Sequence, residues 1–151
     1  MQIQIQDPRI VAPDLRPKTA GSAGIDLHAC IHKIIQLWPG EQITIPVGIK
    51  IALDPGYVGQ IHPRSGLGMK GLILANSTGI IDSDYRGEIA VRLWNRSQNE
   101  NFLIHPMDRV AQLVIVQHYP HNCIEISTAA LPETSRGEQG FGSTGVHSGV
   151  G

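Results

Sequence analysis

Four residues in the middle of the chain, Pro63-Arg64-Ser65-Gly66, combine groups that bind an anion. An arginine guanidinium offers a planar fork of donors that matches phosphate, and a serine hydroxyl and backbone N–H groups add further donors. A helical turn with Ser65 near its N-cap would bring these groups together. The same residues also suit an ordinary turn with an exposed arginine, so this stretch alone leaves both interpretations open.

Three aspartates stand where a carboxylate could take part in chemistry. Asp26 lies between apolar neighbours, and Asp82 and Asp84 lie in a bend that we interpret as part of a hairpin. Two carboxylates at this spacing could indicate calcium, but the glycine and glutamate of an EF-hand loop do not follow them. Aspartate is also common in turns, so each position taken singly allows a structural role.

The C-terminal stretch SRGEQGFGSTGVHSGVG is poor in groups that pack into a core. Its glycine content is typical of a frayed chain end. Arg136, Phe141, Ser143 and Thr144 nevertheless offer a phosphate-binding fork, an aromatic face and two hydroxyls. We therefore expect two parts, a folded domain over residues 1–134 and a flexible arm over residues 135–151 that closes over an active site.

The remaining residues must supply the framework that positions these groups, and their composition favours strands. Isoleucine and valine number 29 against 11 leucines, and glycine and proline number 27 of 151 residues, which suits short strands joined by turns. No window shows a sustained 3.6-residue apolar period, so we predict an all-β domain with at most one short helix, near 65–70. Alternating or continuous apolar runs predict strands at 3–5, 43–45, 49–53, 88–94 and 110–116, the last as a central strand.

Several other classes of protein are excluded. A net charge of −1 does not fit a basic nucleic-acid binder, and no apolar run approaches the ~18 residues of a membrane-spanning helix. The glycines of 66–71 match G-x-G-x-x-G, but a strand and turn follow where a dinucleotide fold requires a long helix. The histidines are scattered and Cys30 and Cys123 lie far apart, so we expect no zinc site and a cytoplasmic protein with free thiols.

Five segments, in this order, resemble the five motifs of the trimeric dUTP pyrophosphatases (dUTPases). They are AGIDLHA at 23–29, PRSGLGMKG at 63–71, GIIDSDYRGE at 79–88 with Asn76 ahead of it, PMDRVAQ at 106–112 and RGEQGFGSTG at 136–145. The resemblance covers essentially the whole chain. Two positions depart from the family pattern: Met107 stands where glycine is common, and Gln139 stands where the tail usually has a second glycine.

The resemblance implies a jelly-roll, a β-sandwich-like barrel, assembled as a homotrimer with active sites shared between subunits. It implies hydrolysis of dUTP to dUMP and pyrophosphate by attack of water on the α-phosphorus, which removes dUTP and supplies dUMP for thymidylate synthesis. The implied cofactor is Mg²⁺. The implied partners are the nucleotide, pyrophosphate and further copies of the chain, with no nucleic acid and no membrane.

The resemblance also implies a role for each candidate residue. Asp82 is the general base that activates water, and Asp26 holds Mg²⁺ through water. The substrate-binding residues fall into four groups: Arg64, Ser65, Gly66 and Gln112 for the α- and β-phosphates; Asn76, Gly79 and Ile81 for uracil; Tyr85 beneath the deoxyribose; and Arg136, Phe141, Gly142, Ser143 and Thr144 for the γ-phosphate and the cover over the uracil ring.

Two alternatives stay open at this point. The dCTP deaminases share the fold, but their third motif resembles D-P-G-F-x-G and precedes a catalytic glutamate in the next strand. Here Tyr85 replaces the phenylalanine and Arg92 stands where the glutamate would be, which argues against deamination. A jelly-roll module that only binds a ligand would not require Asp26, Asp82 and the arm residues together.

Overall fold

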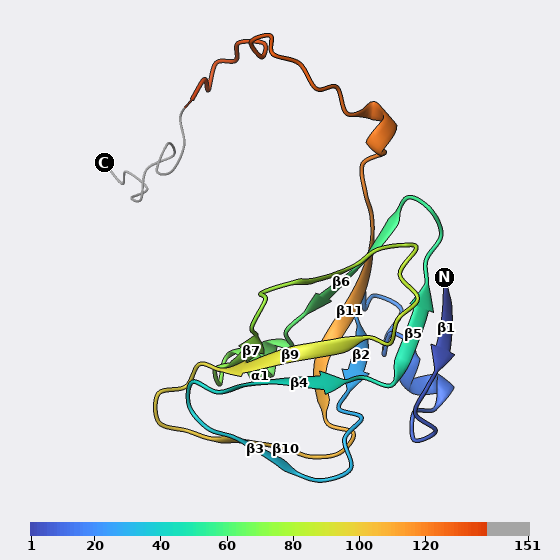
Figure 1. Cartoon of the computed structure of the whole chain (residues 1–151), viewed down its shortest axis with the longest axis vertical. Helices are drawn as coiled ribbons and strands as arrows, with labels where there is room; N and C mark the ends of the chain where they lie inside the picture. Colours follow the sequence, from blue (N-terminus) through green and yellow to red (C-terminus); the bar gives the residue numbers. More distant parts are fainter. Residues whose placement is uncertain (139–151) are drawn as a thin grey trace. The chain divides into compact units, whose positions relative to one another are not determined.

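The computed structural model describes residues 1–138 of the chain, and they divide into two units after Pro120 (Figure 1). This division comes earlier than the boundary expected between residues 134 and 135, which stays a prediction. The second unit, as far as residue 138, contains the short 3-10 turn η2 (His121–Cys123) and no strand. The first unit carries all the other elements described below.

The first unit is a succession of short strands with one α-helical turn, as the composition predicted (Figure 1). In chain order the elements are β1 (Gln2–Ile5), the 3-10 turn η1 (Ala12–Leu15), β2 (Ile25–His28), β3 (Ile35–Leu37), β4 (Gln42–Pro46), β5 (Ile49–Ala52), β6 (Tyr57–His62), α1 (Ser65–Gly68), β7 (Leu72–Leu74), β8 (Gly79–Ile81), β9 (Ala90–Asn95), β10 (Phe102–Ile104) and β11 (Arg109–Gln117).

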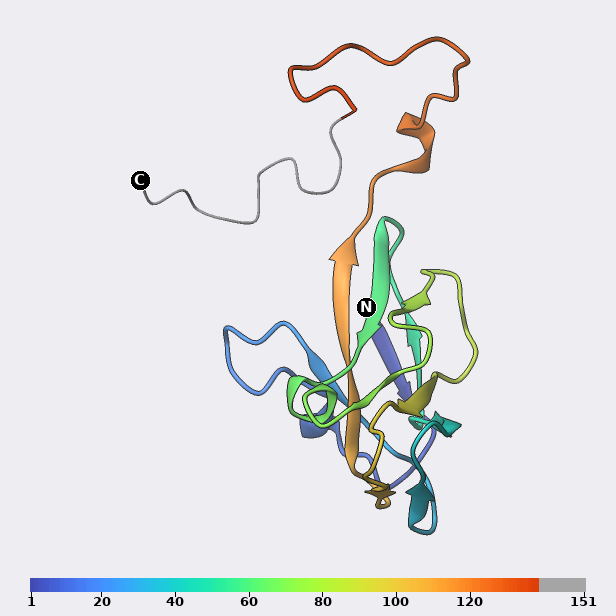
Figure 2. The same ribbon diagram turned by 90° about the vertical axis from the view of Figure 1, so that its left-hand side faces the viewer.

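The strands form four antiparallel sheets of a jelly-roll. The largest has the order β2-β11-β6-β8, a second has the order β4-β9-β7, and the pairs β1-β5 and β10-β3 complete the body. The longest strand, β11, lies between β2 and β6, so the prediction of a central strand at 110–116 is confirmed. Figure 2 shows this strand running through the body, with the turn of α1 beside it.

The core is built from the inward-facing residues of these strands. Side chains such as Leu27, Ile45, Leu93 and Leu113 are 1% exposed or less. Their alternation with exposed neighbours is the period of two seen in the sequence, and burial of this apolar surface drives folding. The core thus fixes β2 and β11, the two strands that carry Asp26 and Gln112.

A β-bulge interrupts the pairing of β11 with β2. Arg109 lies opposite His28 and Ala111 lies opposite Leu27, so Val110 is the extra residue. In a regular strand, residues three apart point to opposite faces, but one inserted residue reverses the alternation. Val110 and Ala111 are consequently both buried, while Arg109 and Gln112 share one side of the sheet.

The turn before β11 explains one departure from the family pattern. Residues 105–108 form a β-turn in which the Asp108 N–H donates to the His105 carbonyl over 3.1 Å. Pro106 occupies the second position, and Met107 occupies the third with φ of 67°. A type II turn requires a positive φ at that position, which is why glycine is favoured there. Met107 adopts it, and its side chain packs against the core.

Two further expectations can be compared with the fold. The helical turn near 65–70 is present as α1, but its N-cap is Arg64 rather than Ser65, and no side chain caps it. The helix therefore starts one residue earlier than expected, at Ser65, and Arg64 is the residue that keeps extended backbone angles. Within residues 1–138, the structure contains no helix long and apolar enough to cross a membrane.

Candidate active site

A polar cleft of about 780 Å³ opens beside β2, β11 and α1. One wall is formed by α1 with its flanks, and the loop that leads into β2 and strand β11 supply the other lining residues. Figure 2 shows this loop, α1 and β11 near one another. Five residues predicted to act on the phosphates or the metal line this cleft: Asp26, Arg64, Ser65, Gly66 and Gln112. The structure therefore brings the first, second and fourth motifs together.

Asp26 is the electrostatic centre of the cleft. Its Oδ1 lies 3.0 Å from Nε of Arg64 and its Oδ2 lies 3.3 Å from Nη1 of Arg109. Nη1 of Arg64 also donates to the backbone carbonyl of Arg109 over 3.2 Å. The two guanidinium groups are therefore held side by side by one carboxylate, 15% exposed, with donors left over for an anion.

His28 lies opposite Arg109 in the register of β2 and β11 and adds no charge to this centre. Its side chain is buried, and burial lowers the pKa of the imidazole below its usual value. The neutral form is therefore favoured beside Arg109.

Gln112 is fixed by its two neighbours in the cleft. Its Nε2 donates to the carbonyl of Pro63 over 3.1 Å, and its Oε1 lies where a Cβ at Gly24 would come within 2.6 Å. A side chain at position 24 would displace this amide from its present position. The second hydrogen of Nε2 remains for a ligand, because an amide nitrogen carries two donors.

The α1 wall offers backbone donors. Ser65 and Gly66 begin the helical turn, where N–H groups have no acceptor within the turn. A Cβ built at Gly66 meets nothing within 4 Å, so this glycine is not required by packing within the chain. Its bare backbone leaves space for a phosphate oxygen to approach the N–H group.

The third motif lies elsewhere, in a segment that we call the corner segment (residues 76–88). The expected hairpin is wrong, because β8 pairs with β6 and β9 pairs with β4 and β7. The chain passes from the edge of one sheet into the other instead of folding back on itself. Asn76, Gly79 and Ile81 are thus placed at or beside an edge strand, β8, whose outer side has no strand partner among residues 1–138.

Asp82 and Tyr85 follow β8 and point outward. Within the described part of the chain, the Asp82 carboxylate has no hydrogen-bond or ion-pair partner, and the Tyr85 side chain is 44% exposed. The Tyr85 hydroxyl donates to the carbonyl of Glu88 over 3.2 Å, and its ring occupies the space that a side chain at Gly87 would need. The ring is therefore held against the backbone of its own segment.

The corner segment does not reach the cleft. Asp26 on β2 aligns, through β11, with His62 at the end of β6, whereas Asp82 follows Ile81, which lies opposite Gly59. With strands about 4.8 Å apart and about 3.3 Å per residue, the Cα atoms of Asp26 and Asp82 are roughly 20 Å apart along the sheet. None of the described residues that line the cleft comes from 76–88.

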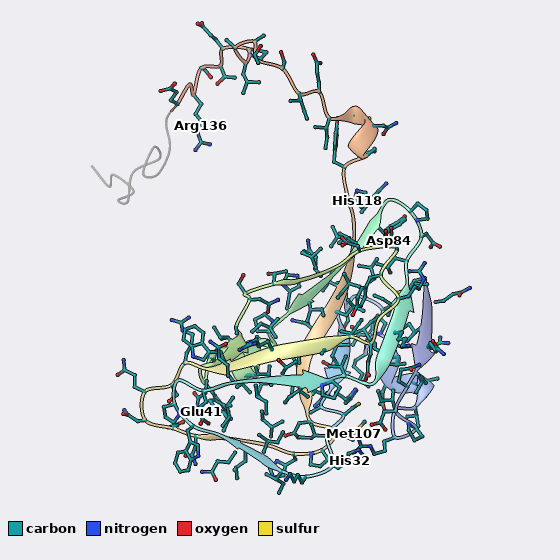
Figure 3. The ribbon with its side chains drawn as sticks, viewed as in Figure 1. His32, Glu41, Asp84, Met107, His118 and Arg136 are labelled. Atoms are coloured by element: carbon teal, nitrogen blue, oxygen red, sulfur yellow. The ribbon has the colours of Figure 1, made fainter. Side chains whose placement is uncertain are left out.

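Figure 3 shows where the corner segment lies in the first unit. Asp84, at the tip of the corner segment, and Met107, in the turn that leads into β11, lie at opposite ends of it. One chain thus presents a polar cleft and a separate exposed carboxylate.

The arm residues can be followed only in part. Arg136 is exposed, in a turn where the N–H of Gly137 donates to the Thr134 carbonyl over 3.1 Å. The other predicted arm residues, Phe141, Gly142, Ser143 and Thr144, lie outside the described residues, as does Gln139.

Sequence reasoning missed three cations in the cleft: Lys18, Lys70 and Arg109. Arg109 and Lys70 lie inside segments that carried the family resemblance, so their charge was an available signal. The position of Arg109 depends on the bulge at Val110, which no apolar pattern reveals. Lys18 lies in the loop before β2, in none of the five segments.

Comparison with known proteins agrees with this geometry. The family model described as dUTPase matches residues 11–145. A deoxyuridine 5'-triphosphate nucleotidohydrolase of Janthinobacterium sp. (strain Marseille) is 46% identical, with 97% of this chain and 98% of that protein covered. The protein of the same name from Burkholderia cenocepacia (strain J2315) is 50% identical, with 85% and 86% covered.

Solved structures of dUTPases share the fold. The crystal structure of dUTPase from Streptococcus mutans has a TM-score of 0.67 and 26% identity, with 80% of this chain and 98% of that chain covered. A mutant dUTPase of Staphylococcus bacteriophage 80alpha, solved with dUpNHpp, has a TM-score of 0.78 over 96% of this chain and 98% of that one. Its identity of 24% supports a likeness of fold alone.

Proposed function

Because the chain belongs to the dUTPase family, we propose that its polar cleft binds the triphosphate of dUTP and that Asp82 of another subunit completes the site. The chain is a dUTP diphosphatase, which hydrolyses dUTP to dUMP and pyrophosphate. The observation that carries the proposal is the convergence of three motifs on one cleft, from which the carboxylate of the third motif is distant.

The phosphate chain is held by charge and by backbone donors. Arg64 and Gln112 donate to the α- and β-phosphates, together with the hydroxyl of Ser65 and the N–H groups of Ser65 and Gly66. The side chains of Arg64 and Gln112 are held by protein contacts before substrate arrives, so they need little reorganisation on binding. The arm residues Arg136, Ser143 and Thr144 are proposed for the γ-phosphate, and Phe141 for the uracil ring.

We propose that Asp82 accepts the proton of the water that attacks the α-phosphorus. Its exposed carboxylate, without a partner within residues 1–138, is available to a neighbouring subunit's cleft. In-line attack requires the water, the base and the phosphorus to be aligned, and a rigid sheet edge under Asp82 supports this alignment. The leaving group is pyrophosphate.

The donor set around Asp26 fits a magnesium ion held through water. Residues 1–138 contain no group of three or more histidine, cysteine or acidic side chains that could hold a metal ion. These residues therefore form no metal site built from protein ligands alone. Mg²⁺ commonly keeps several waters and binds through one carboxylate together with substrate phosphates. Asp26 would supply that carboxylate. When bound, such an ion supplies positive charge against the negative charge of the phosphates.

Uracil recognition is proposed for the edge of β8. Gly79 and Ile81 are two residues apart, so their backbone groups point to the same side of the strand. An edge strand presents N–H and C=O groups in a fixed order, which can match the donor and acceptor edge of a base. Asn76 precedes this strand, and its Nδ2 donates to the carbonyl of Thr78 over 3.4 Å.

We further propose a homotrimer that acts in the cytoplasm. A closed ring of three chains offers three equivalent interfaces, each joining the cleft of one chain to the corner segment of the next. Both cysteines are free thiols, as expected in a reducing compartment. Burial raises the pKa of the Cys30 thiol to about 12, which keeps it protonated.

Complementation between two inactive chains tests the shared site. Asp82→Asn removes the base and Arg64→Met removes a phosphate contact, so trimers of either variant alone should be inactive. When equal amounts are co-expressed, about a quarter of sites combine the intact cleft of one variant with the intact Asp82 of the other. Pyrophosphate release from dUTP should recover to that fraction of the wild-type rate.

Zero recovery, with mixed trimers confirmed by native mass spectrometry, would show that base and cleft belong to one chain. An assay of the wild-type protein with dCTP tests the deaminase alternative. A deaminase would release ammonia from dCTP and leave the triphosphate intact. A protein that bound dUTP without releasing pyrophosphate would contradict the enzymatic function itself.

A further inference from the structure

Lys18 belongs to a loop that forms one rim of the cleft, which we call the rim loop (residues 16–22). The loop is closed on itself, because the N–H of Ser22 donates to the Thr19 carbonyl over 3.1 Å and their hydroxyl oxygens lie 2.7 Å apart. Lys18 immediately precedes this closed turn and lines the cleft, as Ser22 does. The base of the Lys18 side chain is therefore positioned, while its ammonium can move.

The ammonium of Lys18 is weakly engaged. Its Nζ lies 3.6 Å from Oδ1 of Asp14, and the two side chains are 52% and 35% exposed. Such an exposed pair contributes little stability and exchanges readily for a better partner. Arg64 and Arg109, by contrast, both contact the carboxylate of Asp26.

The excess of positive charge in the cleft suits a multivalent anion. Four cationic side chains line it, against the single carboxylate of Asp26 among the described lining residues. The residues proposed for the α- and β-phosphates are concentrated on the α1 wall. Lys18 and Ser22 belong to the rim loop, a separate segment that lines the same cleft.

We propose that Lys18 binds the pyrophosphate end of the substrate, and the pyrophosphate product, from the body of the chain and independently of the arm. An ammonium on a flexible stem suits this role, because it presents three donors to whichever phosphate oxygen is nearest. Lys18 exchanges its contact with Asp14 for a phosphate oxygen when the cleft is filled. This inference rests on the proposed function of the cleft and adds a residue outside the five motif segments.

Inhibition by pyrophosphate measures this contact directly. The inhibition constant of magnesium pyrophosphate in dUTP hydrolysis is compared between the wild-type trimer and Lys18→Met, and calorimetry gives the dissociation constant of pyrophosphate without turnover. We expect both constants to rise about fivefold, less than the full value of a charge-assisted hydrogen bond because Lys18 is half exposed. Lys18→Arg should restore most of the affinity.

Two control variants separate binding from structure. Lys33→Met removes an exposed lysine that is not among the residues lining the cleft, and pyrophosphate affinity should not change. Asp14→Asn breaks the Lys18–Asp14 pair but leaves the ammonium, so affinity should be equal or tighter. If Asp14→Asn weakened pyrophosphate binding as much as Lys18→Met, the pair would be structural and the proposal wrong.

The outcome also distinguishes this inference from the proposed function. Wild-type protein that hydrolyses dUTP and binds pyrophosphate, with Lys18→Met unchanged in both constants and in Tm, would overturn the role of Lys18 alone. Wild-type protein that neither hydrolyses dUTP nor binds pyrophosphate would overturn the assignment of the cleft. A chain ending at Thr134 should still bind pyrophosphate measurably. In this shortened chain, Lys18→Met should weaken pyrophosphate binding further. If Lys18→Met left the affinity of the shortened chain unchanged, the proposal would also be contradicted.

Discussion

The cleft and the corner segment hold their functional groups in opposite ways. In the cleft, Asp26, Arg64 and Gln112 contact one another's strands and loops and are half-buried. In the corner segment, Asp82 and Tyr85 are exposed on an edge of the sheet. The groups proposed to bind phosphate are thus fixed within the chain, whereas the groups proposed for the base, the sugar and the attacking water are exposed on its surface.

This difference has a physical basis. Phosphate carries charge, and charged side chains that bind it must be held in place by opposite charges and hydrogen bonds while the site is empty. Uracil is planar and neutral, and an edge strand already presents the donors and acceptors that it needs. The four predictions below test this contrast, from the largest expected effect to the smallest.

Asp82→Asn should have the largest effect. The substitution keeps the shape of the side chain and removes the base, so kcat should fall by about 10²–10⁴ while nucleotide binding is kept. Rapid-quench measurement of pyrophosphate release, beside calorimetry with a non-hydrolysable dUTP analogue, gives both quantities. Asp84→Asn, two residues away in the same exposed bend, is the matched control and should retain most activity. Equal losses in the two variants would contradict the role of Asp82.

Gly66→Ala should affect binding without affecting the fold. A Cβ at this position meets nothing within 4 Å among residues 1–138, so we expect any loss to arise where a phosphate approaches the backbone. We expect KM for dUTP to rise about tenfold, with Tm equal or slightly higher because alanine stabilises a helical turn. Gly68→Ala lies in the same turn with equally open space and should raise Tm without changing KM. An unchanged KM in Gly66→Ala would show that the N–H group of Gly66 does not bind the phosphate.

Tyr85→Ala should change substrate choice more than rate. If the ring forms the floor under the deoxyribose, its removal opens space for a 2'-hydroxyl, and the preference for dUTP over UTP should fall about tenfold. The ratio of the two kcat/KM values measures this. Tyr85→Phe keeps the ring and loses only the hydrogen bond to the Glu88 carbonyl, so its ratio should stay close to the wild-type value. An unchanged ratio in the alanine variant would assign sugar discrimination to another residue.

The turn at residues 105–108 should produce a small effect on stability. Met107→Ala and Met107→Gly both remove the packed side chain, but only glycine relieves the positive φ of 67°. The free energy of unfolding should therefore be about 1 kcal/mol higher for Met107→Gly than for Met107→Ala, which is the reverse of the usual order for these two residues. Urea unfolding of both variants gives the difference in free energy. A less stable glycine variant would mean that the turn changes conformation when the methionine is removed.

The fold was predictable from composition and alternation to a large extent. The apolar run at 110–116 predicted β11 as a central strand, because a nearly continuous apolar run is typical of a strand that is covered on both faces. The structure places β11 between β2 and β6. The hairpin at 76–89 was predicted wrongly, since a bend between two strands does not show whether they pair with each other. That choice is made by distant partners, β6 for β8 and β4 and β7 for β9.

The candidate site was predictable in membership but not in arrangement. Motif resemblance identified Asp26, Arg64 and Gln112, and the structure brings them together. The resemblance also implied active sites shared between subunits, and the distance of Asp82 from the cleft within one chain agrees with that expectation. The distance itself depends on strand order, which the motifs do not reveal. Arg109 was missed because the bulge at Val110 reverses the alternation that sequence patterns assume.

The position of β11 in the sheet also sets the order in which the molecule can be made. It is the last strand among residues 1–138, yet β2 and β6 pair on its two sides. While the chain is being synthesised, residues 25–28 wait for a partner more than eighty positions later, and such long-range pairing is slow. The cleft cannot exist until residues 109–117 have emerged and inserted, so it is among the last features of the body to form. A chain interrupted before that point has no binding site to occupy.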